Sequence, residues 1–256
     1  MDFLTPVGLA LALIGIVGGM ALEGGHPGAL LQVSAFMIVI LGSLGATLVA
    51  THPRDVPFAL RSVKKAFTPP QHDLQALMDK LLELANLARR EGLLALETFA
   101  SSGQGDPFLV KCLTLAIDGT SADAIREIAE VDMALAEEDD RAGMRFWESW
   151  GALAPTIGVL GAVLGLMHVM SVLNEPSKIG SGIATAFVAT VYGVGYSNVV
   201  CLPMSFKLKR HIEHDQLLKQ MVLEGVVGIQ SGVAPGALRS KLRVYLGHHG
   251  SHAPKK

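Results

Sequence analysis

Charged residues are nearly absent from two long parts of this sequence of 256 residues, which hold only Asp2, Glu23, Glu175 and Lys178. Of its 21 basic and 23 acidic residues, 28 lie between positions 51 and 148, and 12 follow position 206. A soluble fold distributes its charges over its whole surface, whereas here they are segregated and half of all residues are hydrophobic. Together with a mean hydropathy of +0.42, this pattern predicts a membrane protein.

Cysteine, aromatic residues and net charge are also scarce. Two cysteines, Cys112 and Cys201, make neither a disulfide framework nor a metal cluster, and we expect no metal or cofactor. With 5% aromatic residues and a net charge of −2, the chain lacks the stacking surface and the basic excess that nucleic acid requires, so we expect no nucleic-acid partner. No phosphate-binding loop, nucleophile elbow, HExxH or CxxC occurs, so we expect no enzyme.

Four stretches are long, apolar and free of Asp, Glu, Lys and Arg: 3–22, 29–51, 149–173 and 179–206. Each reaches the ~20 residues that a helix needs to cross ~30 Å of hydrocarbon, and nothing alternates like a barrel strand. The sequence therefore predicts an all-α membrane protein with four transmembrane helices. The first stretch follows Asp2 instead of a basic segment and is too long for a signal peptide core, so we expect it to stay in the membrane.

Basic residues near the ends of the spans indicate their orientation. They follow the second and fourth spans and precede the third: Arg54, Arg61, Lys64, Lys65, Arg141, Arg145, Lys207, Lys209 and Arg210. The positive-inside rule then places both termini in the cytoplasm. The predicted parts are a transmembrane hairpin (1–51), a cytoplasmic helical domain (52–148), a second hairpin (149–206) and a cytoplasmic helix with a flexible tail (207–256).

Small residues recur at helical spacing in three of the spans: Gly8, Ala12, Gly15 and Gly19; Gly158, Gly161, Ala162 and Gly165; Gly182, Ala186, Ala189 and Gly193. Such stripes let helix backbones approach closely in lipid, where the hydrophobic effect gives no association energy. We interpret them as helix packing within the chain, and packing between subunits is the alternative.

The spans lack a carboxylate, the usual carrier of a proton or cation in a membrane. If ions cross here, a partner must supply that group. His168 is the one titratable side chain well inside a span, and we interpret it as a packed, hydrogen-bonded histidine, with a proton relay as the alternative.

Two prolines lie within the later spans, Pro155 and Pro203. Each removes a helical hydrogen bond and frees a carbonyl, which favours a hinge, a polar oxygen in a cavity, or a kink with only structural meaning. Thr156 and Thr190 place hydroxyls on the same helices, where they either bond back to their own helix or line a path.

The polar region predicts three further helices: an amphipathic one over 71–99, one over 108–118, and one that Ser121 caps and that continues into the third span. The acidic run 137–141 is a solvated face or a docking patch for a basic partner. A helix over 204–230 ends at 232–235, and the histidine-rich segment 247–256 is expected to be flexible, with metal binding as the alternative.

Three motifs resemble the MotA/PomA family of flagellar stator proteins over essentially the whole chain: ARREGLLALE at 88–97, APTIGVLGAVLGLMH at 154–168, and GIATAFVATVYG at 182–193 followed by Pro203. The resemblance implies that Arg89 and Glu97 interact with the rotor switch protein FliG, and that Pro155 and Pro203 are functional prolines. We expect the ion pathway and its coupling to involve Pro155, Thr156, Ala162, Thr190 and Pro203.

The resemblance also implies the assembly. It predicts a ring-shaped homopentamer around a dimer of a single-pass, peptidoglycan-bound partner of the MotB or PomB type, in the bacterial inner membrane. The partner's aspartate would carry the ion, and the flux would turn the ring against the rotor. Sodium-driven relatives tend to have a threonine at Ala162 and a threonine pair at Ala189–Thr190, so we expect protons to be the transported ion.

Two other interpretations remain. An energiser of the ExbB/TolQ type shares the later two-helix core, but such proteins usually have one span before the large cytoplasmic region, where this chain has two. A passive scaffold or channel subunit without ion coupling predicts that changes at Pro155 or Thr190 leave function intact.

Overall fold

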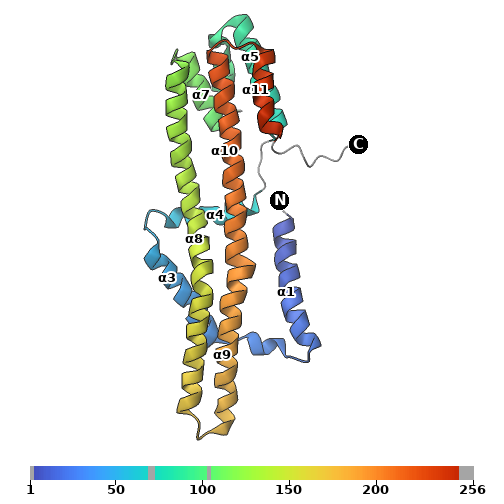
Figure 1. The fold of residues 1–256 in the computed structure, drawn as a ribbon, viewed down its shortest axis with the longest axis vertical. Coiled ribbons are helices and arrows are strands. Elements are labelled where there is room, and N and C mark those ends of the chain that lie inside the picture. Colours follow the sequence, from blue (N-terminus) through green and yellow to red (C-terminus); the bar gives the residue numbers. More distant parts are fainter. Residues whose placement is uncertain (1–2, 69–72, 103–104, 248–256) are drawn as a thin grey trace. The chain divides into compact units, whose positions relative to one another are not determined.

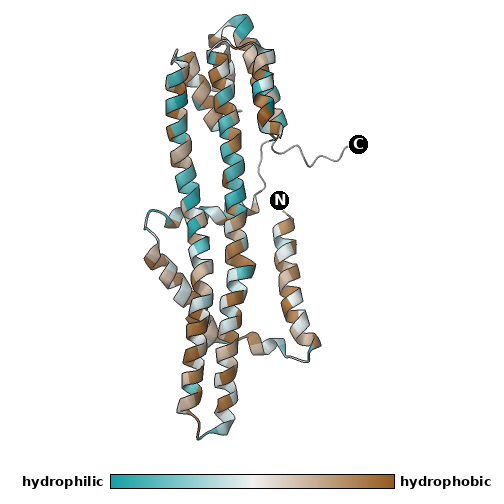
Figure 2. Ribbon diagram, viewed as in Figure 1, coloured by the Kyte–Doolittle hydropathy of each residue, from teal (hydrophilic) through white to brown (hydrophobic). Residues whose placement is uncertain are grey.

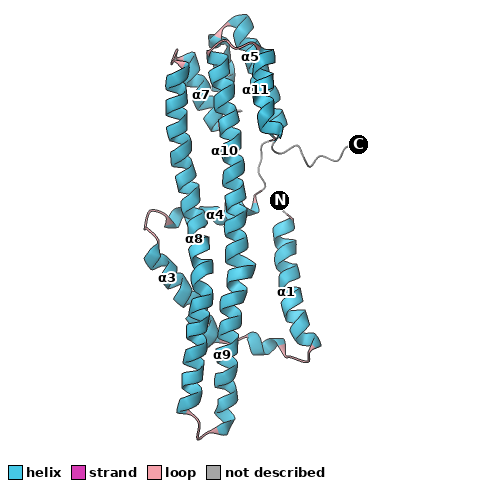
Figure 3. Cartoon of the chain, in the orientation of Figure 1, coloured by secondary structure: helices cyan, strands magenta, loops and turns pink. Residues whose placement is uncertain are grey.

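A computed structural model describes residues 3–68, 73–102 and 105–247. All regular elements of these residues are helices (Figure 3), and four helices are long and apolar enough to cross a membrane, so the predicted all-α membrane fold is confirmed. The chain forms two compact units: a first unit of Met1–Pro69 with Asp139–Arg210, and a second unit of Pro70–Glu138 with His211–Lys256.

The first unit holds the apolar helices (Figures 1 and 2). Its elements are α1 (Leu4–Leu22), a 3₁₀ turn (Pro27–Leu30), α2 (Val33–Phe36), a π turn (Met37–Leu41), α3 (Gly42–Ala50), α4 (Val56–Phe67), the later part of α8 (Ala122–Ser171), α9 (Pro176–Tyr196), a second π turn (Ser197–Cys201) and the start of α10 (Leu202–Gln230). The segments from α2 to α3 form one continuous helix, as do those from α9 to α10.

The second apolar helix begins at Val33, four residues later than the stretch 29–51 suggested. Pro27 starts a separate 3₁₀ turn, and Gln32 has an extended backbone with φ −116° and ψ 113°, which starts the helix anew. The predicted limits of the cytoplasmic parts, 52–148 and 207–256, mark a membrane surface and stay predictions, because the two compact units are defined by packing alone.

The second unit contains α5 (Leu74–Glu91), a 3₁₀ turn (Leu93–Leu96), α6 (Glu97–Ser101), α7 (Pro107–Ile117), the first part of α8, the later part of α10, and α11 (Pro235–Gly247). Side chains of Asp73 and Asp106 cap α5 and α7 by accepting backbone N–H groups, and Ser121 caps α8 in the same way. The expected helix over 108–118 and the cap at Ser121 are therefore confirmed.

One apolar core fills the second unit, and leucines supply much of it: Leu74, Leu81, Leu84, Leu96, Leu113, Leu238 and Leu242 are buried. An ion-pair cluster ties three of its helices together, because Glu224 of α10 forms ion pairs with Arg126 of α8, at 2.7 Å, and with Lys241 of α11. Cys112 lies in this core with 1% of its surface exposed, and burial raises the pKa of its thiol to about 11.

The expected single helix over 71–99 is wrong at Gly92. There the backbone adopts φ +86° and ψ 169°, a conformation essentially restricted to glycine, and α5 ends. Positions 71 and 72 and the histidine-rich residues 248–256 lie outside the described residues. In the acidic run 137–141, Asp140 pairs with Lys65 of α4 at 2.6 Å, so this carboxylate is part of the packing of the first unit.

Candidate functional site

The small-residue stripes of the third and fourth spans pack against each other in the first unit. A Cβ atom at Gly193 of α9 would lie 2.6 Å from the carbonyl oxygen of Ala154 in α8, and one at Gly165 would lie 2.8 Å from the backbone nitrogen of Ala186. Contacts this short leave no room for a methyl group. These two stripes therefore serve packing within the chain, as expected.

The stripe of the first span is different. All residues of α1 remain at least partly exposed, and Cβ atoms at Gly8, Gly15, Gly18 or Gly19 would meet nothing within 4 Å. The packing interpretation does not hold for this stripe within the described chain. What covers α1 must come from outside this chain.

Pro155 lies inside α8, and the helix continues through it without interruption. Because proline has no N–H group, the carbonyl of Gly151 loses its helical donor. The hydroxyl of Ser197 in the second π turn donates to that carbonyl at 2.6 Å, and Ser197 is 2% exposed. The polar oxygen that Pro155 frees is thus bound within the chain.

The other residues predicted for the ion pathway have different surroundings. Thr156 is exposed and Thr190 is half-buried, and their hydroxyls bond back to Leu153 and Ala186 of their own helices at 2.8 and 3.2 Å. Ala162 is half-buried beside Gly161, which contacts α9. Pro155, Thr156, Ala162 and Thr190 all belong to the α8–α9 pair.

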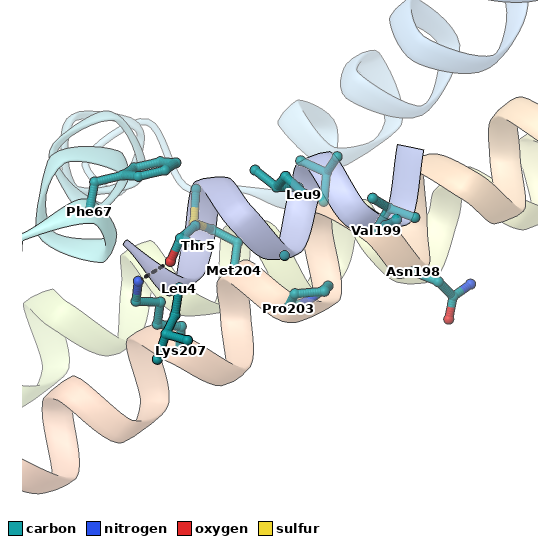
Figure 4. A pocket seen from close by; sticks show the side chains of 12 residues that line it. Leu4, Thr5, Leu9, Phe67, Asn198, Val199, Pro203, Met204 and Lys207 are labelled. Carbon is teal, nitrogen blue, oxygen red and sulfur yellow. Dashed lines mark hydrogen bonds between the residues drawn. The ribbon is translucent and has the colours of Figure 1, made fainter. Parts of the chain in front are cut away.

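Pro203 is not part of that group. It follows Gly193 by ten residues, about 15 Å along a helix, and it lines a cavity of about 400 Å³ against α1 (Figure 4). The structure therefore brings Pro155 and Gly193 together and places Pro203 at the contact between α1 and α10.

His168 lies on an exposed face of α8, so the expectation that it is packed is wrong for the single chain. The same helix exposes Val159, Val163 and Met167. Between positions 149 and 206 the only charged residues are Glu175 and Lys178, which lie near the turn between α8 and α9. An ion that moves along this surface meets no carboxylate of this chain within the span.

Arg89 and Glu97 are both exposed in the second unit. Arg89 lies in the last turn of α5, and Glu97 starts α6, where a carboxylate is favoured by the helix dipole. The break at Gly92 separates the two residues, so their relative orientation is not the one that a single continuous helix would give them. Among the described residues neither has an ion-pair partner, and Arg89 borders a cavity of about 230 Å³ with Leu93 and Gly232.

Sequence reasoning missed two polar contacts of the α8 tryptophans. The indole of Trp150 donates to the hydroxyl of buried Ser43 in α3 at 2.9 Å, and that of Trp147 donates to Ser62 in α4 at 3.0 Å. The two indoles stack with their centroids 5.6 Å apart. Neither the type nor the sequence position of these serines and tryptophans indicates such a partner.

Comparison with known proteins places these features in a family. Residues 100–221 match the MotA/TolQ/ExbB proton channel family, and residues 6–92 match the Motility protein A N-terminal family. Motility protein A of Helicobacter pylori is 36% identical over 96% of this chain and 95% of its own length. The chain belongs to the MotA family.

Solved structures agree with this membership. The chain is similar to a chain in the structure of C. jejuni MotAB, with a TM-score of 0.91, 31% identity and complete coverage of both chains. It is also similar to a chain of the flagellar MotAB stator complex from Bacillus subtilis, with a TM-score of 0.87 and 34% identity over 95% of this chain and 96% of that one. The MotA fold therefore extends over the whole chain.

The two family matches cover the predicted sites unequally. Pro155, Thr156, Ala162, Thr190 and Pro203 lie in the segment shared with TolQ and ExbB. Arg89 lies in the segment specific to motility proteins, and Glu97 lies between the two matched segments. The MotA-specific segment also includes both early spans, which weighs against the ExbB/TolQ interpretation.

Proposed function

We propose that this chain is the MotA-type subunit of a bacterial flagellar stator, which couples inward ion flow to torque on the rotor. The observation that carries the proposal is similarity over the full length, in sequence and in fold, to proteins named for motility and for the MotAB stator. The proposed role is ion conduction and mechanical work without catalysis, and no cofactor is required for it.

The partner in this proposal is a single-pass protein of the MotB or PomB type. It would supply the aspartate that the spans of this chain lack, and a dimer of it would lie inside a homopentamer of this chain. Support comes from the exposed apolar faces of α8 and α9 and from the exposed α1, because apolar helix surface of this extent requires lipid or protein to cover it. The site of action is the bacterial inner membrane, with both termini in the cytoplasm.

Protons are the proposed ion. Sodium needs several oxygen ligands, and Ala162 supplies none from its side chain. Ala189 is fully buried against Gly161, so a hydroxyl at that position would not reach an open path without displacing the helices. The carbonyl freed by Pro155 already accepts the Ser197 hydroxyl. These features favour proton coupling through the partner's aspartate.

Rotor contact is proposed for Arg89 and Glu97, with FliG as the partner. Both side chains are exposed, and they carry opposite charges on either side of the helix break at Gly92. Exposed charges of this kind guide encounter and register more than they add affinity.

The first experiment deletes the gene in its host, together with any second stator set, and compares filaments with swimming. We expect normal filaments that do not turn, rescue by the wild-type gene, and poor rescue by Arg89→Glu or Pro155→Leu at equal protein levels. Normal swimming with impaired outer-membrane uptake would contradict the proposal and favour an ExbB/TolQ-type energiser. Full rescue by Pro155→Leu would favour a passive scaffold.

The ion is tested by replacement. Tethered-cell rotation should continue when sodium is replaced by potassium at constant membrane potential, and it should stop when a protonophore collapses the proton gradient. Rotation that follows the sodium concentration would overturn proton coupling and leave the stator assignment intact.

A further inference from the structure

A cavity of about 400 Å³ lies in the first unit between α1, the second π turn and the start of α10 (Figure 4). Its volume is within the range of small-molecule sites. Most of its wall is apolar and comes from Leu4, Leu9, Val199, Val200, Pro203 and Met204. It is therefore a compartment for an apolar group at the level of the spans.

Small residues keep the α1 side of this cavity open. Gly8 and Ala12 line it, and a Cβ atom at Gly8 would meet nothing within 4 Å. On the opposite side the helix passes through a π turn before Pro203, which changes the direction of the side chains relative to a regular α-helix. The cavity therefore results from the small residues of α1 and from the π turn that precedes Pro203.

The cavity has one cationic end. Lys207 lines it, and its ammonium group donates a hydrogen bond to the hydroxyl of Thr5 and lies 6.0 Å from the ring centroid of Phe67 (Figure 4). Lys209 and Arg210 follow in α10.

We propose that this cavity binds one acyl chain of an anionic phospholipid, with the lipid phosphate at Lys207. An apolar compartment that ends in a lysine matches a hydrocarbon chain that ends in a charged headgroup. Basic pockets between helices on the cytoplasmic side of a membrane have this preference, because anionic lipids are enriched there. The choice of leaflet rests on the orientation predicted from the basic residues. Pro203 is the one residue that the cavity lining shares with the expected ion pathway.

The test uses the full-length chain in complex with its partner, reconstituted into vesicles of phosphatidylcholine containing about one-fifth phosphatidylglycerol. The probe is phosphatidylglycerol with a diazirine in its acyl chain, and peptide mass spectrometry locates the label after illumination. We expect the label in residues 4–12 and 198–207.

Two matched pairs of variants distinguish lipid binding in the cavity from labelling by lipid that contacts the helices elsewhere. Lys207→Gln should lower this labelling about fivefold, the effect of about one basic residue at an anionic surface, whereas Lys209→Gln should leave it unchanged. Gly8→Leu fills the cavity and should abolish the label. Gly15→Leu places the same side chain on the same face of α1, two turns away and outside the cavity lining, and should not.

Size-exclusion chromatography establishes that each variant complex is intact. Equal labelling by a diazirine phosphatidylcholine, or unchanged labelling of Lys207→Gln, would overturn the proposal of an anionic lipid. Absence of label from both segments in the assembled complex would mean that a neighbouring copy of the chain fills the cavity, and would also overturn it.

Discussion

The hydroxyl of Ser197 donates a hydrogen bond of 2.6 Å to the carbonyl oxygen of Gly151, the carbonyl that Pro155 leaves without a helical donor. The donor lies at the first residue of a π turn, and both residues are buried. Two irregularities in neighbouring helices, a proline in α8 and a π turn after α9, are therefore joined by one bond. We interpret Ser197 as a residue that positions the helix around Pro155.

Ser197→Ala should destabilise the protein, because it leaves a buried carbonyl without a partner at a cost of about 1–3 kcal/mol. For a chain of this size that corresponds to a thermal midpoint lower by roughly 2–10 °C in a detergent-solubilised complex. In a Pro155→Ala background the N–H of residue 155 is available to the Gly151 carbonyl, so the same substitution should have little further effect.

The double-mutant cycle makes this prediction specific to the bond. An equal loss of thermal midpoint in both backgrounds would show that Ser197 acts only through packing. Ser197→Thr keeps the hydroxyl and should retain more of the thermal midpoint than Ser197→Ala does.

Gly193→Ala should disrupt the α8–α9 pair. The new methyl carbon would lie 2.6 Å from the carbonyl oxygen of Ala154, and overpacking of this kind costs about 1–3 kcal/mol. We expect a lower yield of assembled complex on size-exclusion chromatography and reduced swimming. Gly195→Ala is the matched control in the same helix, since its Cβ meets nothing within 4 Å. Similar losses for both variants would refute the close-contact argument.

Gly92→Ala should impair rotor contact without removing the protein from the membrane. The backbone at Gly92 has φ +86°, which costs a residue with a Cβ atom about 1–3 kcal/mol and favours continuation of α5. The relative direction of Arg89 and Glu97 would then change. We expect slower swimming at normal protein abundance, and no change for Gly236→Ala at an unstrained glycine. Normal swimming of the Gly92→Ala strain would show that rotor contact does not depend on the backbone break at Gly92.

The ion-pair cluster at Glu224 predicts acid sensitivity of the second unit. Burial alone raises the pKa of Glu224, but hydrogen bonds and charges from Lys241 and Arg126 outweigh it, so the pKa lies below its ordinary value of 4.5. A lowered carboxyl pKa stabilises the fold above the unfolded-state pKa, and this stability is lost as the pH falls from about 4.5 through the folded-state pKa.

Labelling of buried Cys112 by an aromatic disulfide, in a Cys201→Ala background, measures opening of this unit. We expect the labelling rate, divided by that of the denaturant-unfolded chain at the same pH, to rise several-fold as the pH falls below about 4.5. This ratio cancels the fall in the thiolate fraction with acid. Glu224→Gln should label faster at neutral pH and show a weaker pH dependence, whereas Glu213→Gln, at an exposed position of the same helix, should behave like the parent. A pH profile shared by all three proteins would exclude Glu224 as the cause.

The four spans could be predicted because absent charges and helical length leave few alternatives in a membrane. The start of α7 at Pro107 and the end of α10 before Gly232 follow from local signals, a capping Asp106 and a glycine with φ +67°. The close approach of α8 and α9 follows from their glycine spacing. These features depend on residues near one another in sequence.

Other features depend on residues far apart, and the sequence did not reveal them. Nothing in an apolar stretch distinguishes Ser197 from other serines until Gly151 lies opposite it. Gly92 interrupts an otherwise regular amphipathic pattern, and one glycine inside such a pattern is compatible with a continuous helix. The sequence also did not reveal that Pro203 lines a cavity beside α1, and the expected part of Pro203 in the ion pathway stays a prediction.

Trp147 and Trp150 are the only tryptophans of the chain, and both indole N–H groups are bonded where α3, α4 and α8 meet. Intrinsic fluorescence of the unlabelled protein therefore reports on this junction alone. Because indole emission shifts with hydrogen bonding and water access, a spectrum recorded while an ion gradient is applied to vesicles would follow movement of α8 against the first hairpin in real time. The chain thus contains an intrinsic fluorescent probe at the start of its third span.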